Sequence, residues 1–118
     1  MPGKILLADD DKHIINLYTR IFKGKDYSLT PAFSFAEAAA LIEANHYDLL
    51  VTDLMFPDGL GTELIKLFEK KRAGAKSLLV TGEENPQEIL RSAGISEHFT
   101  KPFDAHRFLA AVTGALND

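Results

Sequence analysis

The sequence contains no cysteine, which excludes a disulfide framework and any metal site built on thiolates. It also lacks an apolar run close to the roughly 20 residues that are needed to span a bilayer. Its start, Met1-Pro2-Gly3-Lys4, has neither the apolar segment nor the cleavage site of a signal peptide. These absences are compatible with a cytoplasmic protein that does not engage a membrane, and we take that location as an expectation.

An excess of positive charge is missing as well. The formal net charge is −4 at pH 7, so the chain has no overall basic surface suited to nucleic acid, and we expect no direct binding to it. The 118 residues, 46% hydrophobic and 25% charged, have the size and balance of one globular domain. Because no linker or repeat interrupts them, residues 1–118 are predicted to form a single domain.

Short apolar stretches alternate along the chain with segments whose apolar residues recur at helical spacing. The stretches at residues 5–8, 27–33, 49–52, 77–81 and 98–100 are predicted as strands. Helical stripes follow at residues 14–22, 38–42, 64–68 and 108–116, with a short fourth helix over 86–93. This order predicts an α/β fold with a doubly wound, five-stranded parallel sheet in the order 2-1-3-4-5 and five helices. Pro31 indicates that the second strand lies at an edge.

Two helix starts can be read directly from the sequence. Ser34 and Glu37 have the spacing of a capping box at the start of the second helix. Asn85 and Pro86 are predicted as the N-cap and the first residue of the fourth helix.

Polar residues interrupt the strand pattern at one recurring place, the carboxyl ends of the strands. They are Asp9-Asp10-Asp11 after the first strand, Asp53 after the third, Thr81 at the end of the fourth and Lys101 after the fifth. Open α/β sheets bind ligands outside these ends, where the strand order reverses, which here is between the first and third strands. We therefore expect the carboxylates to face one another across this crevice, with Thr81 and Lys101 on its far side.

Carboxylates gathered in one crevice need a compensating cation, or their pKa values must rise. Mg²⁺ fits best, because it prefers oxygen ligands and is usually held by one or two carboxylates together with phosphate oxygens. The absence of cysteine and the scattering of the four histidines disfavour softer metals. A lysine and a threonine hydroxyl opposite the metal would suit the oxygens of a phosphoryl group in transfer. The sequence thus predicts a Mg²⁺-dependent phosphoryl site.

Each of these residues also has a simpler interpretation. Asp11 is favoured as the N-cap of the first helix over a metal ligand. Asp9 and Asp10 could lie in a solvated loop, and Asp53 could begin a turn before the Pro-Asp-Gly at 57–59. Thr81 could merely end its strand and Lys101 could lie in a loop. The coincidence of all four features at strand ends favours the shared site.

Four segments, ILLADDD, DLLVTDLMFPDGLG, LLVTG and FTKPF, resemble the receiver domain of two-component response regulators, and the likeness covers the whole chain. The resemblance implies a flavodoxin-like fold and a Mg²⁺ cofactor bound by Asp9 and Asp10, of which Asp10 is the more direct ligand. It also implies that Asp53 is both phosphoacceptor and metal ligand. The backbone carbonyl of Met55 would be the remaining protein ligand.

The same resemblance implies how the phosphoryl group is transferred. Asp53 would attack a phosphorylated histidine of a sensor histidine kinase or histidine phosphotransfer protein and form a labile acyl phosphate. Thr81 and Lys101 would contact the phosphoryl oxygens, and a cis bond before Pro102 would aim the lysine. Met55 and Glu83 occupy positions that tune hydrolysis in this family. Such a domain is not an enzyme, because it assists only its own phosphorylation and dephosphorylation.

The resemblance further implies a downstream protein or output domain, reached through the face of the fourth helix, fifth strand and fifth helix, which in many receivers also forms homodimers. Two departures fall in this region. His98 stands where an aromatic residue usually swings in behind the lysine, and we favour a packing role over pH sensing. Residues 82–97 form a short segment, which indicates either a truncated or reoriented fourth helix or neutral loop variation. A stand-alone domain and a fragment of a longer regulator or hybrid kinase are both compatible with the sequence.

The main alternative is a Mg²⁺-dependent phosphohydrolase of the haloacid dehalogenase type. The spacing of Asp9 and Asp11 fits it, Lys101 could be its lysine, and Asp104 would be what is left of its late acidic pair. This alternative leaves the segment around Asp53 unexplained and has no room for a cap domain. Phosphorylation of Asp9 rather than Asp53 would identify it.

A third possibility is a binding module, either a docking domain that works without phosphorylation or a flavodoxin-like nucleotide binder. The three aspartates occupy the loop where a bound phosphate would need Ser, Thr or Gly, which disfavours the nucleotide binder.

Other charged features are interpreted as structural. The third helix has a basic end, made of Lys66, Lys70, Lys71 and Arg72, which is favourable for the helix dipole and typical of a solvated face. His46 and His106 have no functional constellation around them in the sequence.

Overall fold

The computed structural model describes residues 3–83, 86–94, 98–101 and 104–117. Within them the strands are β1 (Lys4–Ala8), β2 (Ser28–Ala32), β3 (Leu49–Asp53), β4 (Met55–Phe56), β5 (Gly59–Leu60), β6 (Lys76–Thr81) and β7 (Phe99–Thr100). The helices are α1 (Lys12–Ile21), α2 (Phe35–Ala44), α3 (Gly61–Lys71), α4 (Gln87–Ser92) and α5 (Ala105–Asn117). The predicted alternation of strands and helices is confirmed.

Five of the strands form a parallel sheet in the order β2-β1-β3-β6-β7, which is the predicted 2-1-3-4-5 order once the short β4–β5 pair is set aside. β2 is an edge strand, as Pro31 indicates, and Pro31 pairs with Leu7 of β1. β3 lies between β1 and β6, and all five of its residues are buried. Asp53 therefore ends an enclosed central strand of the sheet.

A second, antiparallel pair of strands between β3 and α3 is absent from the predictions. Met55 of β4 pairs with Leu60 of β5, and Phe56 pairs with Gly59. These residues and the turn between them, Met55 to Leu60, are called the β4–β5 hairpin below. The hairpin begins two residues after Asp53, so its placement bears directly on what surrounds that carboxylate.

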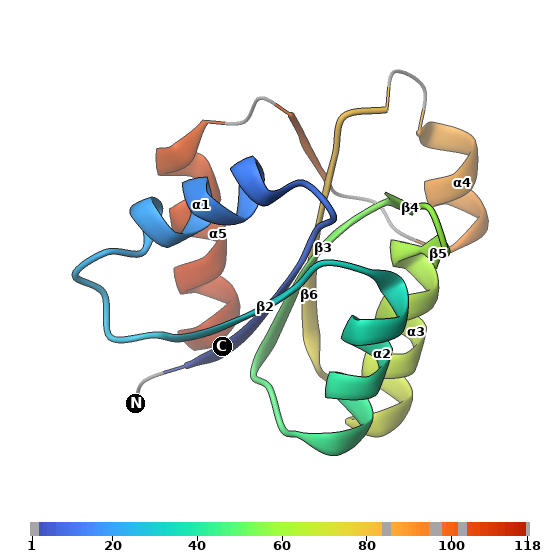
Figure 1. Cartoon of the computed structure of the whole chain (residues 1–118), viewed down its shortest axis with the longest axis horizontal. Helices are drawn as coiled ribbons and strands as arrows, with labels where there is room; N and C mark the ends of the chain where they lie inside the picture. The colour runs from blue at the N-terminus through green and yellow to red at the C-terminus, as the bar shows by residue number, and fades with distance from the viewer. Residues whose placement is uncertain (1–2, 84–85, 95–97, 102–103, 118) are drawn as a thin grey trace.

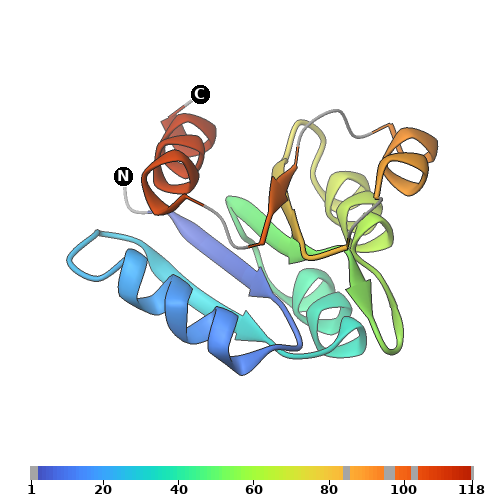
Figure 2. The same ribbon diagram turned by 90° about the horizontal axis from the view of Figure 1, so that it is seen from above.

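The alternation of side chains along the buried strands divides the core into two layers. Ile5 and Leu7 of β1 pack with residues of α1 and α5, whereas Leu6 and Ala8 pack with residues of α2, α3 and α4. Figures 1 and 2 show this division, with α1 and α5 on one side of the sheet and the other three helices on the opposite side. Covering both faces in this way buries the strands and leaves their ends exposed to ligands.

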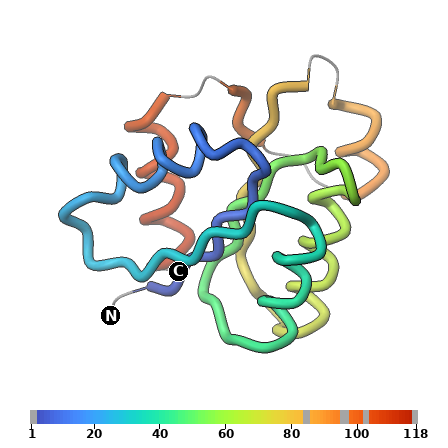
Figure 3. The backbone as a smooth tube through the Cα atoms, viewed as in Figure 1, coloured from blue at the N-terminus to red at the C-terminus, as the bar shows by residue number. Residues whose placement is uncertain are grey.

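The carboxyl ends of the parallel strands gather at one end of the sheet, the upper end in Figure 3. The segments that follow β1, β3 and β6 meet there. Among the described helices, none combines the length and the apolar character that crossing a membrane would require.

The first two helices begin at the predicted caps. The side chain of Asp11 accepts the N–H of His13 at 2.8 Å, which confirms Asp11 as the N-cap of α1. Ser34 Oγ accepts the N–H of Glu37 at 3.1 Å. The Glu37 carboxylate in turn accepts the N–H of Phe33 at 2.7 Å, so the capping box closes one residue earlier than the standard motif.

The last two helices are organised differently from one another. α4 has only six residues, which agrees with the predicted short helix. Pro86 is its N-cap rather than its first helical residue, and the cap predicted at Asn85 lies outside the described residues. At α5, Asp104 accepts the backbone N–H groups of His106 and Arg107 at 2.9 and 3.3 Å.

Candidate functional site

Three carboxylates come together at the carboxyl end of the sheet, as the sequence predicts. Asp9 follows β1, Asp10 lies next to it, and Asp53 ends β3; each offers an oxygen within 4.8 Å of the others. Asp9 is fully buried and Asp53 is 8% exposed, whereas Asp10 faces solvent. The cluster is therefore a pocket with a buried floor and one open side.

Lys101 brings the only cation that is paired with this cluster among the described residues. Its Nζ lies 2.8 Å from Asp9 Oδ2 and 3.3 Å from Asp53 Oδ2. The expectation that Lys101 occupies the far side of the crevice is refined here, because its amine lies between two of the carboxylates. Burial works to lower the pKa of Lys101, but the hydrogen bond and charge of Asp9, together with the charge of Asp53, outweigh it and raise that pKa.

The buried carboxylates carry a charge that the protein neutralises only in part. Burial raises the pKa of both Asp9 and Asp53, and Lys101, together with backbone hydrogen bonds, opposes that rise without cancelling it. These bonds run from the N–H of Asp11 to Asp9 Oδ1 at 2.9 Å and from the N–H of Leu54 to Asp53 Oδ1 at 2.8 Å. Burial, and then the charges of Asp9 and Asp53, also raise the pKa of Tyr18, which therefore stays protonated.

The donor set fits a hard cation. Three carboxylates face one amine, so negative charge is in excess, and the groups that converge offer oxygen rather than nitrogen or sulfur. Mg²⁺ prefers such ligands and keeps part of its water shell, which the open side at Asp10 would allow. The predicted Mg²⁺ site is thus compatible with the arrangement of these residues.

Thr81 lies at the end of β6, fully buried, on the strand next to Asp53. Its Oγ1 accepts the N–H of Glu83 at 3.0 Å, so the hydroxyl proton remains available to donate. The backbone N–H of Lys101 donates to the Thr81 carbonyl at 2.8 Å, which ties the end of β7 to the end of β6. Glu83 itself is exposed.

The segment after Asp53 is held at its base by close backbone contacts. The N–H of Gly61 donates to the Leu54 carbonyl at 2.7 Å, and the Thr52 hydroxyl donates to the Asp53 carbonyl at 2.8 Å. Met55 is 40% exposed at the start of the hairpin. The Pro-Asp-Gly pattern predicts Asp58 only as part of a turn, but its carboxylate accepts hydrogen bonds from the start of α2.

One further predicted residue that the structure describes is His98, which is half-buried just before β7. The aromatic residue next to it, Phe99, packs edge-on against Phe108 of α5 with ring centroids 5.7 Å apart, and so belongs to the core. Pro102, with its predicted cis bond, lies outside the described residues.

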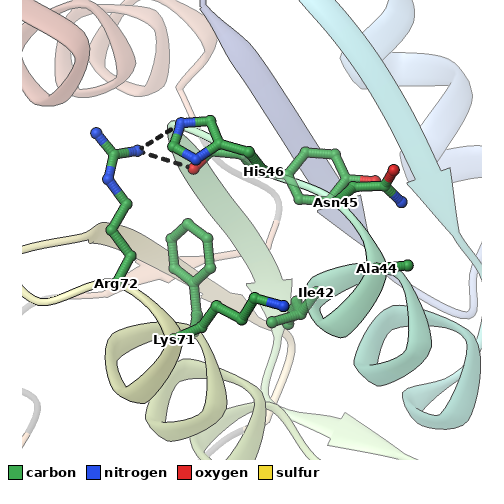
Figure 4. Close-up of a pocket in the computed structure, with 8 residues that line it drawn as sticks. Ile42, Ala44, Asn45, His46, Lys71 and Arg72 are labelled. Carbon is green, nitrogen blue, oxygen red and sulfur yellow. Dashed lines mark hydrogen bonds between the residues drawn. The ribbon is translucent and has the colours of Figure 1, made fainter.

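The opposite end of the sheet holds a pocket of about 350 Å³ between the ends of α2 and α3, shown in Figure 4. Its basic residues Lys71 and Arg72 are exposed, as the sequence-based interpretation of a solvated face expects, and they also make specific contacts. Lys71 Nζ donates to the Glu43 carbonyl at the end of α2, and Arg72 Nη1 contacts His46 Nε2 at 3.1 Å and the Tyr47 carbonyl at 3.0 Å. The view that His46 has no constellation is corrected by these contacts. They tie the end of α3 to the loop before β3, which is a structural role.

Replacing Arg72 with alanine is expected to lower the unfolding free energy by about 1 kcal/mol, because it removes a bond to a backbone carbonyl and a partly exposed ion pair with Asp48. Urea unfolding followed by circular dichroism measures the change. Arg72→Lys keeps the charge but not the forked donor group, so it should recover only part of the loss. An unchanged midpoint for Arg72→Ala would show that the contacts contribute nothing.

Comparison with known proteins connects this geometry to a family. The family described as the response regulator receiver domain matches residues 5–113. The regulatory protein VanRc of Enterococcus gallinarum is 32% identical over 98% of the chain, and the chain spans about half of that regulator's length, 51%.

Solved structures agree in fold. A CheY-like response regulator receiver domain protein from Methanospirillum hungatei JF-1 superposes with a TM-score of 0.87 at 28% identity, covering 99% of this chain and 95% of that one. The receiver domain of HemR from Leptospira biflexa gives 0.82 at 31% identity, covering 98% and 94%.

Proposed function

The chain belongs to the family of response regulator receiver domains, whose common function is phosphorylation-dependent switching, and on that basis we propose that Asp53 is its phosphoacceptor. The observation that carries the proposal is the position of this carboxylate. It ends a central buried strand, is still 8% exposed, and lies against both the acidic pair and the amine of Lys101. No other described carboxylate combines these features.

The acidic pair would hold the Mg²⁺ that the family implies. Asp9, Asp10 and Asp53 would contribute carboxylate oxygens, and the backbone carbonyl of Met55 would contribute the fourth protein ligand. When bound, Mg²⁺ would reduce the repulsion between an anionic nucleophile and an anionic phosphoryl donor.

The transfer would begin with an in-line approach of an Asp53 oxygen to the phosphorus of a phosphohistidine on a kinase or phosphotransfer protein. The new O–P bond forms as the P–N bond breaks, and the imidazole leaves as a neutral ring with a proton supplied by water. The Lys101 amine, which already contacts Asp53, would shift to form an ion pair with a phosphoryl oxygen.

The switch would follow from the Thr81 hydroxyl. It now accepts the N–H of Glu83, and its proton is free to donate. A hydrogen bond from this hydroxyl to the new phosphoryl group would turn the side chain and loosen its bond to Glu83, so the segment after β6 would shift. We place the response on the face of α4, β7 and α5. Its partner would be an output domain or a separate protein, and a homodimer is one way of using that face. The location would be the cytoplasm.

Incubation with acetyl phosphate tests the acceptor. Intact-mass measurement should show one added phosphoryl group on the wild type with Mg²⁺, and none without Mg²⁺ or on Asp53→Asn. Borohydride reduction, which converts an acyl phosphate to an alcohol, should mark residue 53 in the peptide map. Asp11→Asn is the matched control: it lies in the same acidic run but caps α1, and it should be modified like the wild type.

Two outcomes would favour the alternatives. A mark on Asp9 would identify the phosphohydrolase, and here Asp104 already serves as a helix cap rather than as part of a late acidic pair. A wild type that takes no phosphoryl group from acetyl phosphate or from a kinase would identify a docking module that works without phosphorylation.

A further inference from the structure

The β4–β5 hairpin is attached to α2 by a carboxylate at its turn. Asp58 Oδ1 accepts the N–H of Phe35 at 3.0 Å, and Asp58 Oδ2 accepts the N–H of Ala36 at 3.0 Å. These are the first two residues of α2, whose N–H groups have no partner within the helix. The N–H of Ala36, and then that of Phe35, keeps the pKa of Asp58 below its usual range, so the carboxylate is ionised and suits the positive end of the helix.

A second contact shows that the hairpin and α2 fit closely together. A Cβ atom at Gly59 would lie 2.5 Å from Cδ2 of the Phe35 ring, so the hairpin backbone approaches this ring as only glycine allows. Phe35 of α2 thus takes part both in the hydrogen bonding to Asp58 and in the packing against Gly59. The turn of the hairpin is therefore held against α2 by packing as well as by hydrogen bonds.

The base of the hairpin is fixed separately, through the N–H of Gly61 and the carbonyl of Leu54 at 2.7 Å. Between base and turn, Met55 and Pro57 are exposed, whereas Phe56 between them is buried in the core. The direction of the Met55 carbonyl thus depends on Phe56 and on the two ends of the hairpin. Of these, the turn is held by a side chain that can be removed without disturbing the base.

We propose that Asp58 is a positioning residue, which aims the backbone carbonyl of Met55 into the acidic cluster by anchoring the hairpin to α2. The inference rests on the proposed function, because it assigns that carbonyl to Mg²⁺. Asp58 would touch neither the metal nor the phosphoryl group. Its removal should weaken Mg²⁺ binding by about tenfold, the lower end of what supporting residues contribute to metal sites.

The test is a calorimetric titration of the purified protein with Mg²⁺, together with amide hydrogen exchange at residues 35 and 36. Asp58→Ala should exchange faster at these amides and bind Mg²⁺ about tenfold more weakly than the wild type. Asp58→Asn should fall between the two, because the amide oxygen can accept one N–H while its nitrogen cannot accept the other.

Ser34→Ala is the matched control. Ser34 caps the same helix through the N–H of Glu37 but bonds no residue of the hairpin, so its loss should lower the stability of the fold, as a missing cap usually does. Its Mg²⁺ affinity should remain that of the wild type. Equal weakening in both variants would overturn the inference, since the effect would then come from α2 in general.

The two proposals fail in different ways. A wild type that binds Mg²⁺ and is phosphorylated on Asp53, with Asp58→Ala unchanged in Mg²⁺ affinity, overturns only the role of Asp58. A wild type that takes up neither Mg²⁺ nor a phosphoryl group overturns the proposed function and this inference with it.

Discussion

Replacing Gly61 with alanine is expected to lower the unfolding free energy by about 3 kcal/mol, the upper range for forcing an extra methyl group into a packed site. A Cβ atom at this position would lie 1.8 Å from the Asp53 carbonyl oxygen and 3.0 Å from Thr52 Oγ1. The backbone cannot retreat, because the N–H of Gly61 is bonded to the Leu54 carbonyl and the residue begins α3. The glycine is required by close approach and not by a positive φ.

This substitution should also displace the phosphoacceptor loop, since the clash falls on the backbone of Asp53 itself. Urea unfolding followed by circular dichroism would measure the stability, and intact mass after acetyl phosphate would measure the acceptor. Gly114→Ala is a control of opposite sign: Gly114 is exposed within α5 and has nothing within 4 Å of its added Cβ, so alanine should stabilise by about 1 kcal/mol. A Gly61→Ala protein as stable as the wild type would contradict the close contact.

The fold could be predicted because its signals are local and repeated. The apolar stretch from Ile5 to Ala8 is buried on both faces, and such a stretch can be recognised without knowing its neighbours. Pro31 marks an edge strand through its missing donor, and Asp11 and Ser34 mark helix starts through their side-chain oxygens. In each case the residue type itself limits the backbone.

The features that the sequence did not predict join segments that lie far apart along the chain. Asp58 binds the start of α2 more than twenty residues earlier, and Arg72 binds the Tyr47 carbonyl twenty-five residues earlier. Neither pairing leaves a periodic pattern, and a Pro-Asp-Gly run predicts a turn without saying what its carboxylate will meet. Such contacts depend on how finished elements pack together.

The candidate site lies between these two cases. Parallel strands must end at the same edge, so Asp9, Asp53 and Thr81 are brought together by topology alone. The placement of Lys101 between two carboxylates depends on how its long side chain turns, and the sequence predicts only the element that carries it. The roles of these residues in phosphoryl transfer stay predictions until the acceptor is mapped.

The buried negative charge of the site should lower the stability of the metal-free fold. Asp53→Asn is expected to raise the unfolding free energy of the Mg²⁺-free protein by about 1 kcal/mol, because it removes a buried charge at the cost of one of the two ion pairs of Lys101. Asp48→Asn is the matched control with the opposite sign. The carboxylate of Asp48 accepts the N–H of Lys4 and faces Arg72, which keep its pKa below the ordinary value, so the charged form stabilises the fold.

The contributions of Asp53 and Asp48 to the unfolding free energy should change in opposite directions as the pH falls. Burial raises the folded-state pKa of Asp53, so its charge costs stability near neutral pH, and that cost disappears as the pH falls through the folded pKa. The advantage of Asp53→Asn over the wild type should therefore shrink on acidification. For Asp48, whose folded pKa is lowered, the stabilisation is present above the unfolded pKa and is lost as the pH falls through the folded one.

Mg²⁺ should reverse the order of stability between the wild type and Asp53→Asn. A ligand that binds only the folded state at a hundred times its dissociation constant adds about 2.7 kcal/mol, which exceeds the gain expected from removing the charge. The variant has lost one of the three clustered carboxylates and should gain much less. Urea unfolding curves should therefore give the variant the higher midpoint without Mg²⁺ and the wild type the higher midpoint with Mg²⁺. A metal-free Asp53→Asn protein less stable than the wild type would show instead that the ion pair with Lys101 outweighs the burial of the charge.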